Sequence, residues 1–190
     1  MHTVYYKLAC DLWMLVAIVW AVGMFVSKRS VRIQSSGSRL FEIALSFLGF
    51  SLVFGHYFRN GWLGERFLPN SNLAGMAGLA LTFLGVGFAI WARLQLGGNW
   101  SGMVTVKRDH TLIRRGPYAL VRHPIYSGFL LAILGVALIV GEYRGFLGLA
   151  VLFLTFLHKS SIEESFMVEQ FDGDYLTYQK QVRALIPFVF

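Results

Sequence analysis

The chain has little charge, a single cysteine and few acidic residues. Only 14% of its 190 residues are charged, whereas 56% are apolar and the mean hydropathy is +0.58. Soluble domains carry roughly 25% charged residues, so this composition excludes that class and indicates a membrane protein. The lone cysteine, Cys10, excludes an intramolecular disulfide and a cysteine-based metal site. The length predicts one domain over residues 1–190.

Five apolar segments predict membrane-spanning helices, because about 20 apolar residues cross the bilayer core. We expect three membrane helices within residues 1–92, and a cofactor-binding core with two more membrane helices and a C-terminal helix within 93–190. The predicted spans are residues 6–26, 40–58, 72–92, 125–141 and 145–158. An amphipathic surface helix is expected over 160–183, with a break near Asp172-Gly173. The predicted fold class is all-α, a polytopic membrane protein with five transmembrane helices, a cytoplasmic cofactor-binding loop and a C-terminal amphipathic helix.

Two polar segments, residues 27–39 and 93–125, connect the predicted helices and show no strand pattern. Glu42 is expected near the end of the second helix, where a charge costs little. The third helix has a face of small residues that predicts close contact with another helix. Its members are Gly75, Gly78, Gly85 and Gly87.

The basic residues are distributed unevenly between the two sides of the predicted membrane helices. With five spans, 13 of the 17 lysines and arginines fall in the linker, the long loop and the C-terminal tail. The positive-inside rule therefore places these segments and the C-terminus in the cytoplasm, with the N-terminus outside; in a bacterium the location would be the cell inner membrane. Because the net charge of +7 is explained by membrane topology, no nucleic-acid partner is expected.

The most polar stretch beside a membrane helix is residues 112–128, LIRRGPYALVRHPIYSG. It contains Arg114, Arg115, Arg122 and His123, and its two prolines bend the backbone at fixed points. Helix N-termini attract anions, so a basic bend that enters a helix predicts a binding site. The alternative is an ordinary cytoplasmic loop with a proline in the first helical turn.

An acidic pair, Glu163-Glu164, follows the last predicted membrane helix. The fourth and fifth helices are joined by a short turn, so their cytoplasmic ends should be neighbours. Arg122, His123 and Tyr126 should then face the two glutamates at the membrane surface. This arrangement has two interpretations: a salt-bridged latch between helix ends, or a pocket for a zwitterionic molecule that opens into lipid.

Other chemistries receive little support from the sequence. His110 and His123, with glutamates at irregular spacing and many nearby arginines, make a poor cation site, so no metal is expected. Ser101 or Ser127 could serve as a nucleophile beside His123, but nothing orients such a pair. No glycine-rich phosphate loop follows a strand.

Taken in order, the motifs of the second half of the chain resemble the isoprenylcysteine carboxyl methyltransferase family, within a wider group of phospholipid methyltransferases. The similarity covers about residues 93–187. The matching motifs are His110-x-Leu112, Gly116-x-Tyr118, Arg122-His123-Pro124-x-Tyr126-x-Gly128, Glu163-Glu164, Phe171-x-x-x-Tyr175-x-x-Tyr178 and Pro187. The resemblance implies a short, prokaryotic-type integral membrane enzyme. It would use S-adenosyl-L-methionine, release S-adenosyl-L-homocysteine, and act on a lipophilic acceptor that enters from the bilayer.

The resemblance also implies roles for individual residues. The expected cofactor contacts are His110, Leu112, Gly116, Tyr118, Arg122, His123, Pro124, Tyr126, Gly128, Glu163 and Glu164. Arg122 and Glu164 are the expected catalytic residues, and Asn99, Trp100 and Arg183 are expected to contact substrate. The favoured reaction is O-methylation of the carboxylate of a prenylcysteine-like or other lipid acid, because a carboxylate is already ionised at neutral pH. An amine acceptor would need a base.

Two alternatives belong to other classes of protein. Membrane sterol-type reductases, which use NADPH, share a similar Arg-His-Pro segment, but with an asparagine and an acid where this chain has Ile125 and Phe129. A non-catalytic membrane protein would use the same residues only as an electrostatic latch. Tight binding of S-adenosyl-L-homocysteine without affinity for NADPH would distinguish a methyltransferase from a reductase, and a non-catalytic protein would bind no nucleoside.

Overall fold

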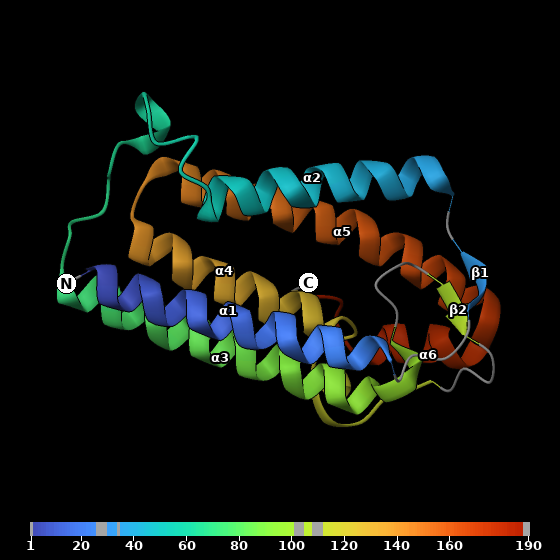
Figure 1. Cartoon of the computed structure of the whole chain (residues 1–190). Coiled ribbons are helices and arrows are strands. Elements are labelled where there is room, and N and C mark those ends of the chain that lie inside the picture. The colour runs from blue at the N-terminus through green and yellow to red at the C-terminus, as the bar shows by residue number, and fades with distance from the viewer. Residues whose placement is uncertain (1, 26–29, 34, 101–104, 108–111, 188–190) are drawn as a thin grey trace.

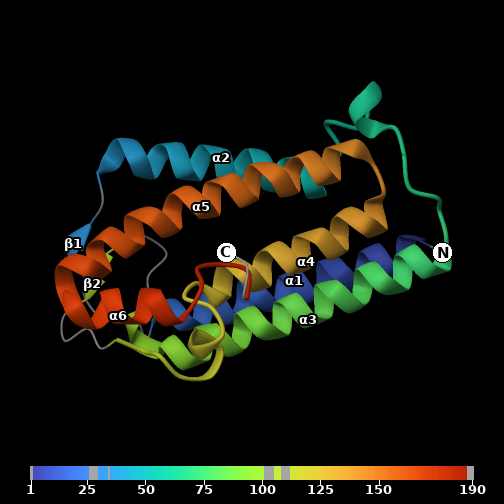
Figure 2. The same cartoon turned by 180° about the vertical axis from the view of Figure 1, so that it is seen from behind.

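The computed structural model describes residues 2–25, 30–33, 35–100, 105–107 and 112–187 and shows a bundle of long helices (Figure 1). The helices are α1 (His2–Met24), α2 (Ser36–Phe54), α3 (Asn72–Leu96), α4 (Pro124–Val140), α5 (Tyr143–Phe171) and α6 (Gly173–Gln181). Three 3-10 turns lie between them: η1 (Trp62–Gly64), η2 (Gly97–Asn99) and η3 (Gly116–Ala119). Successive long helices run in opposite directions, so the start of α2, the start of α4 and the end of α5 lie at one end of the bundle, together with α6 (Figures 1 and 2). We call this the α6 end.

Within the described residues, four helices are long and apolar enough to cross a membrane, namely α1 from Val4 onward, α2, α3 and α5. Helix α4 is apolar but has 17 residues. Its length of about 26 Å is slightly less than the roughly 30 Å of a bilayer core, so a fifth crossing stays a prediction. Helix α5 has 29 residues, and its length of about 43 Å exceeds the core.

The prediction of separate helices over residues 145–158 and 160–183 is wrong, because α5 runs without a break from Tyr143 to Phe171. Polarity rises after His158, but neither proline nor glycine occurs before Gly173. A change of polarity marks where a helix leaves an apolar layer and does not end the helix itself. The predicted break is confirmed at Asp172, whose φ of 43° lies in the left-handed region and separates α5 from α6.

The expectation that the polar connections lack strands is also wrong. Strand β1 (Ser30–Ile33) pairs antiparallel with β2 (Thr105–Lys107), with Ser30 opposite Lys107 and Ile33 opposite Thr105. Both stretches are rich in β-branched residues, but at four and three residues they are too short to show an alternation. The two connections are thereby held together at the α6 end of an otherwise helical protein (Figure 1).

Glycines bring α3 and α4 into direct backbone contact. A Cβ added at Gly135 would lie 2.4 Å from the Gly78 carbonyl oxygen, and one added at Gly128 would lie 2.6 Å from the Gly85 carbonyl oxygen. Small residues at these positions allow the helix axes to approach closely. This confirms part of the predicted small-residue face. Gly87 does not belong to it, because a Cβ there would meet nothing within 4 Å.

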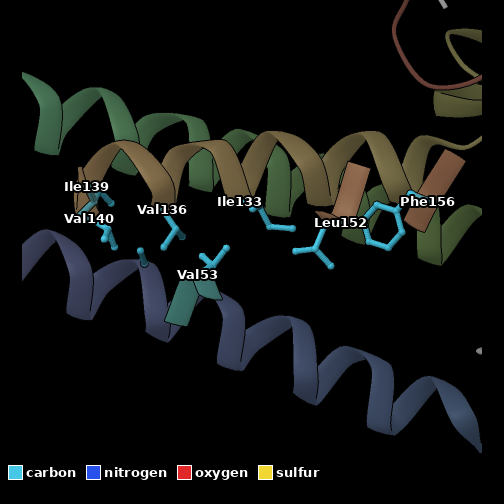
Figure 3. Packing of buried hydrophobic residues seen from close by; sticks show 8 residues of the cluster. Val53, Ile133, Val136, Ile139, Val140, Leu152 and Phe156 are labelled. Atoms are coloured by element: carbon cyan, nitrogen blue, oxygen red, sulfur yellow. The ribbon is translucent and has the colours of Figure 1, made fainter. Parts of the chain in front are cut away.

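Residues of α1, α2, α4 and α5 form the apolar core, and Figure 3 shows them from close by. Its labelled members are Val53, Ile133, Val136, Ile139, Val140, Leu152 and Phe156. Tyr126 and Phe129, in the first two turns of α4, pack against this cluster. The core therefore fixes the position of the helix start that follows the basic bend.

Candidate functional site

The chain enters α4 through a bend that glycine and proline residues determine. Gly116 has a φ of 62°, a conformation that residues with a side chain rarely adopt. Pro117 lies in the first turn of η3, and Pro124 is the first residue of α4, where a missing backbone donor costs no hydrogen bond. The bend places Arg122 and His123 directly before the helix.

The segment that follows α6 binds back onto this bend. The backbone N–H of Arg122 donates to the carbonyl of Arg183 at 2.8 Å, and that of His123 donates to the carbonyl of Ala184 at 2.9 Å. The Ser127 hydroxyl donates to the carbonyl of Leu185 at 2.5 Å. The last described segment and the start of α4 therefore form one unit.

Arg122 and Glu164 form a bidentate ion pair. Arg122 Nε donates to Glu164 Oε1 at 2.8 Å, and Nη2 donates to Oε2 at 3.1 Å. Arg122 Nη1 donates to the carbonyls of Gln179 and Val182. Only 12% of the Arg122 side chain and 16% of the Glu164 side chain are exposed, so this charge-assisted pair is largely shielded from water. The predicted juxtaposition of Arg122 with the acidic pair is confirmed.

His123 lies between the two glutamates. Its Nε2 is 3.0 Å from Glu164 Oε1, and its Nδ1 is 3.3 Å from Glu163 Oε2. Burial disfavours the charged imidazolium, but the hydrogen bonds to Glu163 and Glu164 outweigh burial and raise the pKa of His123. With an acceptor at each ring nitrogen, the doubly protonated form fits this position.

Tyr126 connects the ionic group to the apolar core. Its hydroxyl donates to Glu163 Oε1 at 2.5 Å. Its ring stacks on His123, with centroids 5.6 Å apart, and on Phe156, with centroids 4.9 Å apart. The Nζ of Lys159 lies 5.7 Å from the same ring. The three stacked rings lead from the charged residues into the buried cluster, so polar and apolar surfaces meet at Tyr126.

Helix α6 closes the other side of the ionic group. Gln179 Nε2 donates to Glu164 Oε2 at 2.7 Å, and the Tyr178 hydroxyl donates to the backbone carbonyl of Tyr118. Burial raises the pKa of Tyr178 to about 12, because ionisation would place a negative charge out of water. Arg114 pairs with Asp174 at 3.3 Å. These contacts join α6 to α5, to η3 and to the segment before η3.

The structure brings most of the predicted cofactor residues to this end of the bundle. Besides Arg122, His123, Tyr126, Glu163 and Glu164, these are Leu112, Gly116, Tyr118 and Pro124. Tyr118 is buried, with its hydroxyl 3.5 Å from the carbonyl of Ala92. His110 lies outside the described residues. Whether any of these residues contacts a cofactor stays a prediction.

Other predicted positions have a packing role in the structure. Gly128 lies against α3, as described above. Trp100 packs on Trp20, and the Arg93 guanidinium lies 4.4 Å from the Trp100 ring. Arg93 donates to the carbonyls of Gly23 and Gly97 at the ends of α1 and α3. Asn99 ends η2, and the Arg183 side chain is exposed. Their contact with substrate stays a prediction.

Sequence reasoning missed Gln179 and misjudged Glu42. Gln179 belongs to no motif, and only its place beside Tyr178 on an amphipathic helix could have indicated a role. Glu42 was expected at a helix end where a charge costs little, but it is buried and its Oε1 has no hydrogen-bond partner. The physical reason is that α5 covers this face of α2, which the sequence of α2 alone does not reveal.

The fold and this ionic group together define a helical membrane protein with a polar site at one end of its bundle. The sequence profile of the phospholipid methyltransferase family matches residues 73–174, which is more than half of the chain. The protein belongs to this family, and it is an integral, multi-pass membrane protein.

Several known proteins are similar to this chain. The protein-S-isoprenylcysteine O-methyltransferase of Schizosaccharomyces pombe is 37% identical over 101 residues, which are 52% of this chain and 43% of that protein. The enzyme of the same name from Saccharomyces cerevisiae is 30% identical over 122 residues, 63% of this chain and 51% of that protein. The chain thus spans about half the length of these curated relatives.

A solved structure agrees with these relationships. The structure of the eukaryotic intramembrane Ras methyltransferase, isoprenylcysteine carboxyl methyltransferase, has a TM-score of 0.51 and 26% sequence identity. The alignment covers 83% of this chain and 55% of that chain. The resemblance inferred from the sequence motifs is confirmed at the level of the family and the fold.

Proposed function

We propose that this protein is an S-adenosylmethionine-dependent membrane methyltransferase that acts on a lipophilic acceptor. The observation that supports this most directly is the convergence of Arg122, His123 and Tyr126 with Glu163 and Glu164 in a chain of this family. A latch would need only one ion pair. Here two carboxylates, an imidazole, a guanidinium and a phenol meet where the polar end of the bundle joins the apolar core.

The side chains present fit the chemistry of the cofactor. Glu163 and Glu164 can accept from an ammonium group or from ribose hydroxyls, and Arg122 can pair with a carboxylate. The aromatic face of Tyr126 can stabilise a sulfonium. Glu163 is the more accessible carboxylate, with 24% of its side chain exposed against 16% for Glu164. When bound, the cofactor supplies an electrophilic methyl group.

The chain's own residues would align the reactants and exclude water. Tyr126 is fixed by stacking on His123 and Phe156 and by its bond to Glu163, so it can orient a bound group without reorganisation. The apolar cluster next to Tyr126 would keep this ring in place while an acceptor arrives through the bilayer. Alignment and removal of water are the main contributions to a methyl transfer.

Two acceptor chemistries are compatible with this proposal. A prenylcysteine-like or other lipid carboxylate is the acceptor that the resemblance favours, and it needs no base because it is ionised at neutral pH. A lipophilic amine would also need a group that takes up a proton. The choice between the two depends on the charges around Tyr126.

The distribution of arginines between the two ends of the bundle supports a cytoplasmic C-terminus and an external N-terminus. Arg93 lies near the end of α3, and Arg114 and Arg122 contact α6 and the end of α5, all at the α6 end; Arg66 and Arg144 lie at the opposite end, at the end of α4 and the start of α5. The positive-inside rule places the α6 end in the cytoplasm. A phosphatase reporter fused after residue 190 should be inactive, and an active reporter would contradict this orientation.

Binding of S-adenosyl-L-homocysteine to the purified protein tests the proposed function. We expect saturable binding by isothermal titration calorimetry in detergent or nanodiscs, competition by S-adenosyl-L-methionine, and no binding of NADPH. Tight NADPH binding would indicate the reductase alternative. A folded protein that binds neither S-adenosyl-L-homocysteine nor NADPH would indicate that the ionic group only holds the helix ends together.

A further inference from the structure

Asp11 is a carboxylate within the apolar span of α1, far from the ionic group at the α6 end. The span is Val4–Met24, and Asp11 lies about 10 Å along it at a rise of 1.5 Å per residue. Its side chain is exposed on the outside of the bundle and makes no hydrogen bond or ion pair with the residues that the structure describes. An aspartate is too short to carry its charge from this depth to water, and ionisable residues in membrane segments usually mark functional sites.

The described cations around Asp11 do not neutralise it. Helices α1 and α3, which lie side by side in Figures 1 and 2, contain one lysine and one arginine. Lys7 is exposed one turn nearer to the start of α1 and forms no ion pair with Asp11. Arg93 lies near the other end of α3 and donates to backbone carbonyls there. Arg59 acts on Tyr6, whose hydroxyl donates to α2 on another side of α1.

Asp11 lines a groove between α1 and α3. The groove has a volume of about 600 Å³. Apart from Tyr5 and Asp11, the side chains that line it are apolar, and they include Leu8 and Leu15 of α1 and Phe83 of α3. An apolar groove between two helices is a shape that a third helix can fill.

The exposed side of α1 carries the spacing of a coiled-coil seam, in which steps of four and three residues alternate. Its members are Val4, Leu8, Asp11, Leu15, Ile18 and Val22. The five apolar members are between 44% and 61% exposed, and the stripe is about 27 Å long. A stripe of this length and period fits another helix, and a single polar residue within such a seam fixes the register of its partner.

The adjoining face of α3 permits a close approach. Ala80 lines the groove and is exposed. Gly87, about two turns further along the same face, is exposed as well, and a Cβ there would meet nothing within 4 Å. Small residues allow the backbones of membrane helices to approach each other. The space beside Gly87 therefore fits a helix from outside this chain.

The charge of Asp11 determines which occupant fits. A lipid chain would cover the apolar side chains but leave the carboxylate unpaired. A second copy of this chain, inserted in the same orientation, would bring its own Asp11 to the same depth, where two carboxylates repel. A lysine or arginine of a neighbouring helix would pair with Asp11 and remove an unpaired charge from the apolar layer.

We propose that the groove between α1 and α3 binds a transmembrane helix of another membrane protein, and that a lysine or arginine of this helix pairs with Asp11. The inference does not depend on the proposed function, because Asp11 lies away from the α6 end. The family profile matches residues 73–174, so this comparison assigns no role to α1.

Matched transmembrane peptides test this proposal with the full-length protein in lipid nanodiscs. The probe is a dansyl-labelled helix of leucine and alanine that has either lysine or leucine at the depth of Asp11. Energy transfer from the protein's five tryptophans to the dansyl group measures binding. We expect the lysine peptide to bind about 5- to 30-fold more tightly than the leucine peptide, the range for a polar contact between membrane helices.

Substitutions in the groove separate charge from shape. Asp11→Asn should remove the preference for lysine, and Asp11→Glu should keep it. Glu65→Gln, which removes an exposed charge outside the long helices, should leave the preference unchanged. Ala80→Phe fills part of the groove and should weaken both peptides, whereas Ala77→Phe places the same bulk at an exposed position that does not line the groove. Unchanged midpoints of thermal unfolding would show that the variants are folded.

Four results would overturn the proposal. The first three are absence of peptide binding, equal binding of both peptides by the wild type, and a lysine preference that persists in Asp11→Asn. The fourth is energy transfer between donor- and acceptor-labelled copies of the protein that Ala80→Phe abolishes, because a second copy would then occupy the groove. A lysine preference that depends on Asp11, together with displacement of the bound probe by unlabelled lysine peptide, would support it.

Discussion

Two arginines, one at each end of the bundle, show how differently this protein uses a buried cation. Arg144, with 1% of its side chain exposed, donates to the carbonyls of Leu52, Val53 and Gly55 and to its close neighbour Glu142. Arg122 pairs with a carboxylate 42 positions away in the sequence. Arg144 thus satisfies the carbonyls at the end of α2, where a positive charge is also favoured by the helix dipole.

The difference lies in what surrounds each arginine. Around Arg144 the partners are mostly backbone carbonyls, which cannot change charge or rearrange without unfolding the helix end. Arg122 also donates to two backbone carbonyls, those of Gln179 and Val182, but its charged partner is the carboxylate of Glu164, which in turn binds the side chains of His123 and Gln179. Arg144 therefore serves to stabilise the fold, whereas we expect the Arg122 group to exchange one partner for a ligand.

The largest expected effect is on stability, from Arg144→Leu. The substitution leaves three buried carbonyls and Glu142 without their cation, which should lower the free energy of unfolding by about 3–5 kcal/mol. Thermal unfolding in detergent, followed by tryptophan fluorescence, measures this loss. Folded protein that remains should bind S-adenosyl-L-homocysteine normally. A specific loss of affinity in a stable variant would mean that the two ends are not separate in function.

The next effect is on ligand affinity, from Glu164→Gln. Glu164 accepts bonds from Arg122, His123 and Gln179, so loss of its charge should weaken S-adenosyl-L-homocysteine binding by about 10- to 100-fold. The matched control is Glu142→Gln, the same change beside Arg144, which should leave affinity unchanged. Calorimetry measures both. Equal losses in the two variants would remove the proposed distinction between the ends.

A smaller effect is expected on the pH dependence of stability. The pKa of His123 is raised in the folded protein, since its bonds to Glu163 and Glu164 outweigh the effect of burial. The stabilisation is therefore complete below the unfolded value of about 6.5 and is lost as the pH rises through the folded pKa. The midpoint of thermal unfolding should fall over that range in the wild type. His123→Gln should flatten this part of the profile, and an unchanged slope would show that His123 does not titrate as described.

The smallest effect is expected for Tyr178→Phe. The substitution removes the hydrogen bond to the buried carbonyl of Tyr118, which should cost about 1 kcal/mol in the free energy of unfolding. Thermal unfolding again provides the measurement. A much larger loss, or a loss of ligand affinity alone, would show that the contact between η3 and α6 belongs to the site itself.

The sequence predicted the meeting of the basic bend with the acidic pair better than it predicted the connections. The motif from Arg122 to Tyr126 and the pair Glu163-Glu164 were expected to meet, because a short turn between two apolar helices makes their ends neighbours. The continuity of α5 was missed because the change from apolar to polar residues was interpreted as the end of a helix. A helix ends at residues that interrupt its backbone, such as proline and glycine, and not where its polarity changes. Glu42 was misjudged because its burial depends on packing with α5, a contact between segments far apart in sequence.

Titration of the purified protein with S-adenosyl-L-homocysteine tests the central claim most directly, with wild type, Glu164→Gln and Glu142→Gln compared in one lipid environment. The account predicts saturable binding by wild type and Glu142→Gln and a weakening of about 10- to 100-fold in Glu164→Gln. A folded wild type that binds no nucleoside, or a Glu164→Gln variant that binds it as tightly as wild type, would contradict the assignment of this ionic group as the cofactor site.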